Sequence, residues 1–428
     1  MYAKALQYLE SLAKFGIRPG LDRIEALMKL MGNPERKYRT IHVTGSNGKG
    51  STTAFIASIL QSSGIRTAMF TSPHLESYTE RMVIDDERIG EEDFARAIDH
   101  VRIHVENMLK LDYEQPTEFE VLTAAALWYF AEQEVEYAVI EVGMGGLLDS
   151  TNVIWPQVSV ITNVALEHTD RCGGTIAEIA EHKAGIVKLG TPVVTAAKAE
   201  ALNIIFEKTE LLHARLYQLG RDFFVQLKAV IDKKQGLVFR SNEHGNFVGL
   251  KTTLIGEHQA ENCGCAIMTA HILSLKDSRI TPRSIVEGVN LTRWAGRFEY
   301  MSDKPDIIVD GAHNLAGATA LRAALDEQYK LRPIIFVFCV LAVKDVSGMW
   351  EVLFRPVDSV IVTAPLSYRA ATADDVAAQI KAERVETAPT IEEAIKRAIA
   401  WAGEDGAVCV CGSLYLIGTA RAKLLEML

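Results

Sequence analysis

Short apolar runs alternate with segments of helical periodicity along most of the chain. Apolar runs bounded by turn residues predict buried strands, and longer amphipathic segments predict helices. In the first half, strands are expected at residues 40–43, 67–70, 137–142, 158–162 and 192–195. Helices are expected between them, at residues 49–63, 91–109, 118–133 and 175–187. The alternation predicts an α/β fold with a mostly parallel sheet flanked by helices.

A different pattern occupies residues 221–254. Short alternating runs are separated there by turn signals, such as the lysine- and glycine-containing residues 232–236. Alternation with such turns predicts a small antiparallel patch. Residues 258–275 then return to helical periodicity.

The α/β pattern starts again after Trp294. Strands are expected at residues 307–310, 334–340, 359–363 and 407–411, and helices at 317–329, 373–381, 391–402 and 414–427. This second half predicts a smaller, Rossmann-like α/β domain. We place the boundary near residues 290–298, which gives domains of residues 1–293 and 294–428.

Composition narrows the class of protein. The chain has 428 residues, 48% of them apolar, and a formal net charge of −10. This acidic balance disfavours nucleic acid as a partner, because such proteins usually carry a basic face. No apolar run approaches the ~18–20 residues that a membrane span needs, and the N-terminus lacks the pattern of a signal peptide. We therefore expect a cytoplasmic protein with no membrane partner. The acidic charge does not argue against a small anionic ligand, and a monomer is expected because no strong interface signal is present.

The six cysteines show no C-x-x-C pair, and three lie in strongly apolar runs. The two C-x-C pairs are interpreted as small core residues rather than metal ligands. A reduced, intracellular setting fits this usage.

The residues that follow the first predicted strand have the character of a phosphate-binding loop. They read Thr-Gly-Ser-Asn-Gly-Lys-Gly-Ser over residues 44–51 and lead into a predicted helix. Glycines let successive backbone N–H groups face one anion, and the helix N-terminus adds its dipole. Lys49 can reach terminal phosphates, and Ser51 or Thr52 lies near the position of Mg²⁺. The spacing differs from the usual motif, since Val43 replaces the first glycine and Gly50 separates Lys49 from Ser51.

Polar residues also end later strands of the first domain. Glu141 closes an apolar strand before the glycine-rich residues 143–149, where a carboxylate is placed to hold Mg²⁺. His168 follows the next strand and is a candidate second metal ligand. The simpler interpretation of Glu141 is a solvated glutamate at the end of a strand, and that of His168 is a structural histidine. Taken alone, Ser72 is interpreted as a turn serine and Lys183 as a helix-surface lysine.

The second domain repeats this arrangement. Asp310, His313 and Asn314 lie just beyond a predicted strand, and Ser413 lies between a strand and a helix. These groups can capture a small polar substrate or the ribose and base of a nucleotide. Ordinary helix capping also accounts for Asn314 and Ser413.

In their order along the chain, these segments resemble folylpolyglutamate synthase/dihydrofolate synthase, in the ATP-dependent Mur-ligase-like superfamily. The resemblance extends from Phe15-Gly16 to Tyr415. Its motifs here are HVTGSNGKGST, TSPHL, TEFE, EVGMGG with DSTN, EHKAGIVK, GRFE, DGAHN and GSLYLIG. It implies that residues 1–293 form an ATP-binding, central-type domain of a Mur ligase and residues 294–428 its C-terminal-type domain.

The resemblance also implies roles for single residues, several of them catalytic. Asn47, Gly48, Lys49, Gly50 and Ser51 would hold ATP phosphates, with further ATP contacts from Asn262, Arg297 and Asp310. One Mg²⁺ would be bound by Ser72 and Glu141 and a second by His168, while Lys183 would be carbamylated. Arg297 would face the phosphates across a cleft. Thr117, Phe119, Glu120 and Asp149 would line the site of the pterin-bearing substrate, and His313 and Ser413 would help to place glutamate.

The implied reaction is amide ligation. ATP would convert a carboxylate into an acyl phosphate, and the amino group of L-glutamate would then displace phosphate. The acceptor would be the γ-carboxylate of a reduced folate or folylpolyglutamate, with dihydropteroate as an additional acceptor.

Three departures from the family pattern bear on this interpretation. Leu147 stands where arginine is usual, Glu167 stands where aspartate is usual, and residues 343–345 keep only part of a D/N-K-D motif. Two alternatives stay open. A peptidoglycan-precursor ligase is less favoured because no separate domain for a UDP-sugar precedes the phosphate loop. A nucleotide-binding regulator without ligase activity is disfavoured by the retained Lys49 and Glu141.

Overall fold

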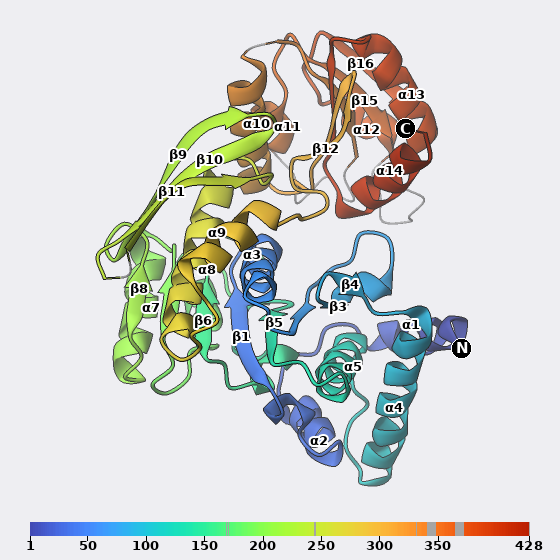
Figure 1. Cartoon of the computed structure of the whole chain (residues 1–428). Coiled ribbons are helices and arrows are strands. Elements are labelled where there is room, and N and C mark those ends of the chain that lie inside the picture. Colours follow the sequence, from blue (N-terminus) through green and yellow to red (C-terminus); the bar gives the residue numbers. More distant parts are fainter. Residues whose placement is uncertain are drawn as a thin grey trace. The chain divides into compact units, whose positions relative to one another are not determined.

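Two units, each built around a sheet of its own, make up the chain (Figure 1). The first comprises Met1–Gln226, Leu237–Leu250 and Glu261–Thr292, and the second Leu227–Gly236, Lys251–Ala260 and Arg293–Leu428. The computed structural model describes residues 1–167, 169, 171–243, 245–330, 332–339, 348–363 and 372–427.

An eight-stranded sheet organises the first unit, in the order β4-β3-β2-β5-β1-β6-β7-β8. All pairs from β2 to β8 are parallel, and β3 and β4 add an antiparallel edge. The register pairs Val43 with Glu141 and Thr44 with Ile161, so the carboxyl ends of the three central strands lie together. The strands are β1 (Arg39–Thr44), β2 (Thr67–Phe70), β3 (Met82–Ile84), β4 (Glu87–Arg88), β5 (Tyr137–Glu141), β6 (Val158–Ile161), β7 (Val193–Thr195) and β8 (Leu216–Gln218).

Helices cover this sheet and share its cores. One core joins α1, α2, α4 and α5 to β2, β3 and β5, and a second joins α6 and α7 to β6, β7 and β8. Helix α3, buried along most of its length, packs on α9, where Gly288 is required because a Cβ there would lie 2.4 Å from the Cα of Ile59. The helices are α1 (Tyr2–Leu12), α2 (Asp22–Leu30), α3 (Lys49–Ser62), α4 (Glu91–Lys110), α5 (Glu118–Glu132), α6 (Ile176–Ala184), α7 (Ala199–Leu211) and α9 (Pro282–Leu291), with short 3-10 turns η1 (Ala13–Phe15), η2 (Pro34–Arg36), η3 (Tyr78–Arg81) and η4 (Ser150–Val153).

A three-stranded sheet, β11-β10-β9, follows in the chain and precedes helix α8 (Glu257–Ser274). Its strands are β9 (Phe223–Ile231), β10 (Lys234–Ser241) and β11 (Gly245–Thr252). Only two residues connect β9 to β10, a length that joins antiparallel neighbours alone. This sheet is the small antiparallel patch that the sequence predicts.

The second unit contains a six-stranded sheet in the order β12-β13-β17-β14-β15-β16, parallel except for β12. Helices α10 and α11 lie against one core of the sheet, and the apolar face of α13 packs on its strands. The strands are β12 (Glu299–Asp303), β13 (Asp306–Val309), β14 (Ile335–Phe338), β15 (Ser359–Thr363), β16 (Arg384–Ala388) and β17 (Ala407–Cys411), and the helices are α10 (Leu315–Tyr329), α11 (Met349–Leu353), α12 (Ala373–Ala377), α13 (Ile391–Ala402) and α14 (Leu414–Met427).

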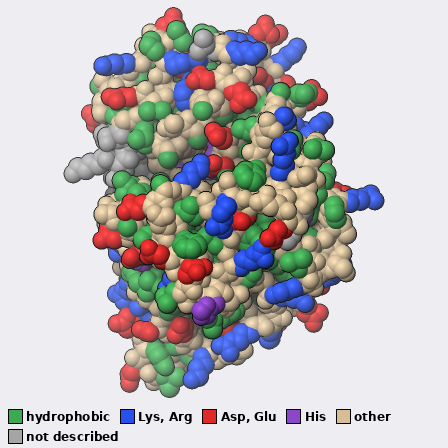
Figure 2. All heavy atoms as spheres, turned by 90° about the vertical axis from the view of Figure 1, so that its left-hand side faces the viewer, with side chains coloured by type: hydrophobic (Ala, Val, Ile, Leu, Met, Phe, Trp, Pro, Cys, Tyr) green, Lys and Arg blue, Asp and Glu red, His purple; other side chains and the backbone are tan. Residues whose placement is uncertain are grey.

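The predicted fold class is confirmed, with a mostly parallel sheet in the first unit and a smaller α/β unit after it. All six cysteines are buried and lie outside disulfide bonds, as their interpretation as core residues requires. No helix within the described residues is long and apolar enough to cross a membrane. Figure 2 shows basic and acidic side chains interspersed over the face in view.

Candidate active site

The predicted phosphate loop connects β1 to α3. Gly45 and Gly48 have φ of 153° and 83°, in the region that favours glycine. A Cβ on Gly48 would lie 2.2 Å from the Oδ1 atom of Asn262, so this α8 residue lies directly against the loop. Asn163, at the end of β6, accepts a hydrogen bond from the Asn47 backbone N–H at 2.9 Å. The loop is therefore fixed by its neighbours on two sides.

Unsatisfied hydroxyl groups lie at the start of α3. Ser51 and Thr52 are buried, and neither side-chain oxygen has a hydrogen-bond partner among the described residues. Leaving such a group unpaired costs about 1–3 kcal/mol, so these oxygens suit a bound ligand such as Mg²⁺ or a phosphate. The Lys49 ammonium donates to the backbone oxygens of Gly45 and Ser46, at 2.8 and 3.3 Å, and thus lies over its own loop.

Glu141 and Ser72 meet at the same sheet edge. The Oε2 atom of Glu141, at the end of β5, accepts a hydrogen bond from the Ser72 backbone N–H at 3.0 Å. This carboxylate and the hydroxyls of α3 are oxygen ligands of the kind that Mg²⁺ takes. His168 lies outside the described residues. Within the part of the chain that is described, no group of three or more His, Cys, Asp or Glu residues is arranged to hold a metal ion.

Lys183 is not the surface lysine that the sequence suggests when the residue is taken alone. Its side chain is 1% exposed and its ammonium lies 2.8 Å from Oε1 of Glu167. Burial and the Lys49 cation lower the pKa of Lys183 to about 8, against the opposing effect of the Glu167 carboxylate. Helix α6 buries this residue because its apolar face packs toward β6 and β7. A buried amine with this pKa is far more often neutral and nucleophilic than an exposed lysine.

A cavity of about 460 Å³ opens in the first unit beside these groups. Thr117 and Glu120 form a capping box at the start of α5, and the Glu120 carboxylate is paired with Arg23 at 3.1 Å. The cavity is lined by Ala13, Gly16, Ile17, Arg18, Pro19, Gly20, Ser72, Pro73, Arg81, Thr117, Glu118, Phe119, Glu120, Leu122, Gly143, Met144, Leu148, Asp149, Ser150, Arg171, Cys172 and His182. All four residues expected at the pterin site, and Ser72, are therefore brought to one cavity.

A hydrogen-bonded network joins this cavity to the strand that carries the phosphate loop. Thr151 donates from its hydroxyl to the Asp149 carboxylate at 2.5 Å, so it accepts from Nε2 of His42, 2.8 Å away on β1. Burial lowers the pKa of His42 to about 3 and raises the pKa of Asp149 above its ordinary value. Asp149 also accepts from the Met144 backbone N–H at 2.9 Å and so orders the glycine-rich loop.

In the second unit, Asp310 and Arg297 lie at one sheet edge. The Asp310 carboxylate accepts backbone N–H bonds from Phe298 and Ala312, both at 2.8 Å. A Cβ on Gly311 would lie 2.0 Å from Nη1 of Arg297, so only glycine lets the guanidinium lie over this loop. Burial, and then the positive charge of Arg297, lower the pKa of His258 to about 4.

The other two predicted residues of this unit lie at its loops. His313 places Nδ1 2.7 Å from the backbone oxygen of Gly311. Ser413 precedes α14 and is buried, and its hydroxyl oxygen has no partner among the described residues. An unpaired buried hydroxyl at a helix start suits a polar ligand.

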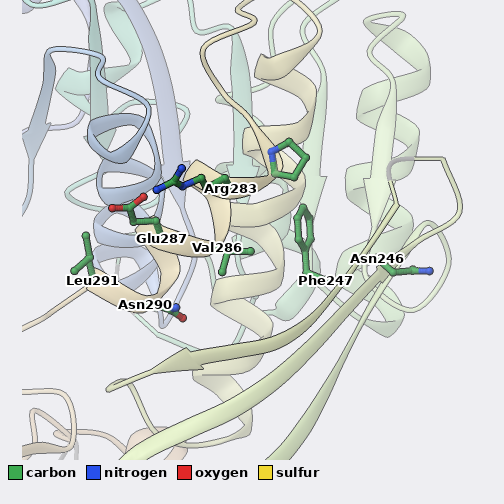
Figure 3. A pocket seen from close by; sticks show the side chains of 8 residues that line it. Asn246, Phe247, Arg283, Val286, Glu287, Asn290 and Leu291 are labelled. Carbon is green, nitrogen blue, oxygen red and sulfur yellow. The ribbon is translucent and has the colours of Figure 1, made fainter.

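A second cavity of the first unit, of about 690 Å³, lies between β11 and α9. Figure 3 shows its side chains, which include Phe247 of β11 and Arg283 and Glu287 of α9. It is lined by none of the predicted site residues, whereas the cavity beside α5 is lined by several of them. Chemistry, rather than volume, therefore identifies the candidate active site.

Comparison with known proteins decides the family. The chain matches the Mur ligase middle domain over residues 43–270 and the Mur ligase glutamate ligase domain over residues 296–414. It is 35% identical to dihydrofolate synthase/folylpolyglutamate synthase of Bacillus subtilis, over 99% of each chain. The chain belongs to the folylpolyglutamate synthase/dihydrofolate synthase family.

Solved structures of this family share the fold. Folylpolyglutamate synthase of Mycobacterium tuberculosis, complexed with ADP and AMPPCP, has a TM-score of 0.89 at 31% identity and covers 99% of both chains. An FPGS–AMPPCP–folate complex has a TM-score of 0.83 at 34% identity, again over 99% of both chains.

The structure of this family member also adds residues that sequence reasoning missed. Arg18, Arg81, Arg171 and His182 line the cavity, and His258 lies near Arg297. Arg18 follows the Phe15-Gly16 segment that carries part of the family resemblance, which was the available signal. His182 belongs to the EHKAGIVK motif, next to Lys183, whereas Arg81, Arg171 and His258 had no motif of their own. Residues 343–345, the incomplete D/N-K-D motif, lie outside the described residues.

Proposed function

We propose that the chain is an ATP-dependent ligase that joins L-glutamate to the γ-carboxylate of a reduced folate or folylpolyglutamate and releases ADP and phosphate. Dihydropteroate is proposed as an additional acceptor. The observation that carries the proposal is the cavity lined by Thr117, Phe119, Glu120 and Asp149, which includes Ser72 from the edge where the phosphate loop begins. The match to family members over nearly the full chain supports the same reaction.

The proposed chemistry has two steps. The γ-phosphoryl group of ATP is transferred to the substrate carboxylate, which gives an acyl phosphate and ADP. The glutamate amine then attacks the acyl carbon, loses a proton and expels phosphate with the bonding electron pair. Phosphoryl transfer depends mainly on positioning and charge neutralisation, which fixed cations supply.

We assign these tasks to individual residues of the first unit. The loop of residues 47–51 holds the phosphates, and Lys49 turns its ammonium from the loop oxygens toward them. Ser72 and Glu141 are proposed ligands of one Mg²⁺, with the hydroxyls of α3 close by, and His168 is proposed for a second ion. When bound, Mg²⁺ neutralises phosphate charge and orients the transferred group. Asn262 contacts the nucleotide from α8.

Lys183 is proposed to be carbamylated. Its neutral amine attacks CO₂ and forms an N–C bond, and the nitrogen releases a proton to solvent, so that a cation becomes an anion. The lowered pKa supplies the neutral amine, and the nearby Lys49 cation favours the anionic product.

Residues of the second unit are assigned to ATP and glutamate. Arg297 is proposed to contact the phosphates, with Asp310 fixing its loop and contacting the nucleotide. His313 and Ser413 are proposed to place glutamate, with the unpaired Ser413 hydroxyl as one donor.

We also propose the domain division at residues 1–293 and 294–428, and a cytoplasmic monomer as the working form. Six buried cysteines outside disulfide bonds are compatible with a reducing compartment.

A ligation assay tests the function. Purified protein is given ATP, Mg²⁺, L-glutamate and either a reduced folate or dihydropteroate, and phosphate release and product mass are followed. We expect a product heavier by one glutamyl residue, and its loss in Glu141→Gln. Ligation only to a UDP-sugar peptide acceptor would indicate the peptidoglycan branch, and ATP binding without ligation to any acceptor would indicate a regulator.

A further inference from the structure

Helix α4, which contributes no residue to the lining of the cavity beside α5, carries two histidines on one face. His100 and His104 are separated by four positions, so their side chains lie on the same side of the helix. Their ring centroids are 4.8 Å apart and the ring planes are inclined by 53°. Both side chains are half-buried at the surface.

The neighbouring helix α5 holds one of these rings in place. His100 stacks on Trp128, with centroids 4.2 Å apart and planes inclined by 16°. Arg96, one turn before His100, places its guanidinium carbon 5.6 Å from the centre of the Trp128 ring. The contact restricts the His100 ring to few orientations, and α4 packs against α5 (Figure 1).

The separation of the two rings fits a shared metal ion. A metal–nitrogen bond of about 2.0–2.1 Å places an imidazole centroid ~3.2 Å from the ion. Two rings on one ion therefore have centroids about 4.5 Å apart at a right angle and about 5.2 Å apart at the tetrahedral angle. The observed 4.8 Å lies between these values.

We propose that His100 and His104 form a binding site for a divalent transition-metal ion. Neutral imidazole is a ligand for Cu²⁺, Ni²⁺ and Zn²⁺, and the affinity order at such a site favours Cu²⁺. An imidazole with an ordinary pKa of about 6.5 is mostly neutral at pH 7 and then offers a lone pair to a metal ion. Two imidazoles and solvent make up the coordination, since the described residues supply no group of three or more ligands.

The site is separate from the proposed Mg²⁺ ligands. His100 and His104 lie on α4, whereas Ser72 and Glu141 lie at the carboxyl end of the sheet of the first unit. The rings converge only when the helix is formed, so metal binding stabilises the folded unit.

Copper titration of the full-length protein, without a histidine tag, tests the proposal. Because His100 contacts Trp128, CuCl₂ should quench a saturable part of the tryptophan fluorescence, and Trp128→Phe should remove that part while equilibrium dialysis still detects bound Cu²⁺. His104→Gln leaves the His100–Trp128 stack in place. It should raise the apparent Kd for Cu²⁺ at least about tenfold, because one imidazole then binds the ion instead of two. His213→Gln, at an exposed histidine of another helix end, is the matched control and should bind as the parent does.

ZnCl₂ provides an independent measurement. It should raise the Tm of the parent protein and of His213→Gln, and the rise should be absent in His100→Gln and His104→Gln. Equal copper affinity in the parent, His100→Gln and His104→Gln would overturn the proposal, as would quenching that persists unchanged in Trp128→Phe.

Discussion

At the scale of residues, two lysines of the N-terminal unit show how burial changes the chemistry of one side-chain type. The ammonium of Lys49 lies over a loop of backbone oxygens, where its positive charge is stabilised. Lys183 is enclosed by α6, and the charge of Lys49 further disfavours its protonated form. The first lysine is suited to act as a fixed cation and the second as an amine that accepts CO₂.

Lys49→Ala tests the fixed cation. Removal of one charge-stabilising group costs ~10²-fold or more in turnover at sites of this kind. We expect kcat to fall by at least this factor in the ligation assay, with circular dichroism and Tm close to those of the parent. Lys110→Ala, at the exposed end of α4, is the control and should leave kcat unchanged. Near-normal turnover of Lys49→Ala would remove the phosphate role.

The pH dependence of carbamylation tests Lys183. Its pKa of about 8 means that the neutral amine becomes abundant as pH rises through this value, so carbamate formation should rise with it. The Glu167 carboxylate raises this pKa, so Glu167→Gln should shift the pH midpoint downward. Carbon-13 NMR with labelled bicarbonate measures the carbamate, and Lys183→Arg is the blank. A lysine that gains no label at any pH near or above its pKa would contradict the assignment.

At the scale of elements, the β1–α3 connection is limited by close packing as well as by backbone conformation. Gly48 has a positive φ, and its Cα faces the Asn262 amide so closely that no side chain fits. Gly220 has nearly the same φ, 87°, but its missing Cβ has nothing within 4 Å. A side chain at Gly220 would therefore cause backbone strain alone, whereas a side chain at Gly48 would cause both backbone strain and a steric clash with Asn262.

Gly48→Ala and Gly220→Ala form a matched pair. Each substitution should lower the free energy of unfolding by about 1–2 kcal/mol, because it places an alanine in the left-handed conformation. Gly48→Ala should additionally displace Asn262 or the loop, so ATP affinity should fall at least about tenfold, which corresponds to ~1.4 kcal/mol. Gly220→Ala should keep the affinity of the parent. Equal nucleotide affinity in the two variants, measured by calorimetry, would show that the loop tolerates a Cβ.

The same scale shows where sequence patterns were sufficient. Strands β1, β2 and β5 were predicted within about a residue of their observed ends, because each is a short apolar run closed by polar or glycine residues. Helices α1, α2, α7 and α9 were not predicted, although α9 has a clear capping box at Thr281. Strand β16 was also missed, since its exposed edge position leaves little apolar pattern to detect.

At the scale of the whole molecule, three histidines whose pKa is lowered in the folded chain link folding to pH. The pKa of His42 in the folded chain is about 3 and those of His74 and His258 are about 4, against an ordinary value of 6.5, mainly because of burial. Between the folded and unfolded values, the unfolded chain binds protons that the folded chain excludes. The free energy of unfolding is therefore fully retained above pH 6.5 and falls as pH is lowered toward about 4.

Urea unfolding at a series of pH values measures this dependence. We expect the midpoint to decrease as pH falls below about 6.5, and His42→Gln to show a smaller decrease because it keeps a donor for Thr151 without a titrating ring. His213→Gln, an exposed histidine, should follow the parent curve. Parallel curves for the parent and His42→Gln would show that this ring does not control acid stability.

The sequence by itself determined the α/β class, the phosphate loop and the order of motifs that indicates the family. These features depend on local periodicity, glycine positions and spacing, which are written in neighbouring residues. It also named Thr117, Glu120 and Asp149, but only through resemblance.

Only the tertiary structure decided which of these groups meet and in what electrostatic state. It buried Lys183 beside Glu167 and paired Glu141 with the Ser72 backbone. It also formed the His42–Thr151–Asp149 network, in which His42 and Thr151 are 109 positions apart in the chain. These side chains are shielded from solvent and lie close together only when the strands align in the sheet. No pattern of neighbouring residues in the sequence contains this information. The contact of His100 with Trp128 has the same origin, because two helices bring the rings together.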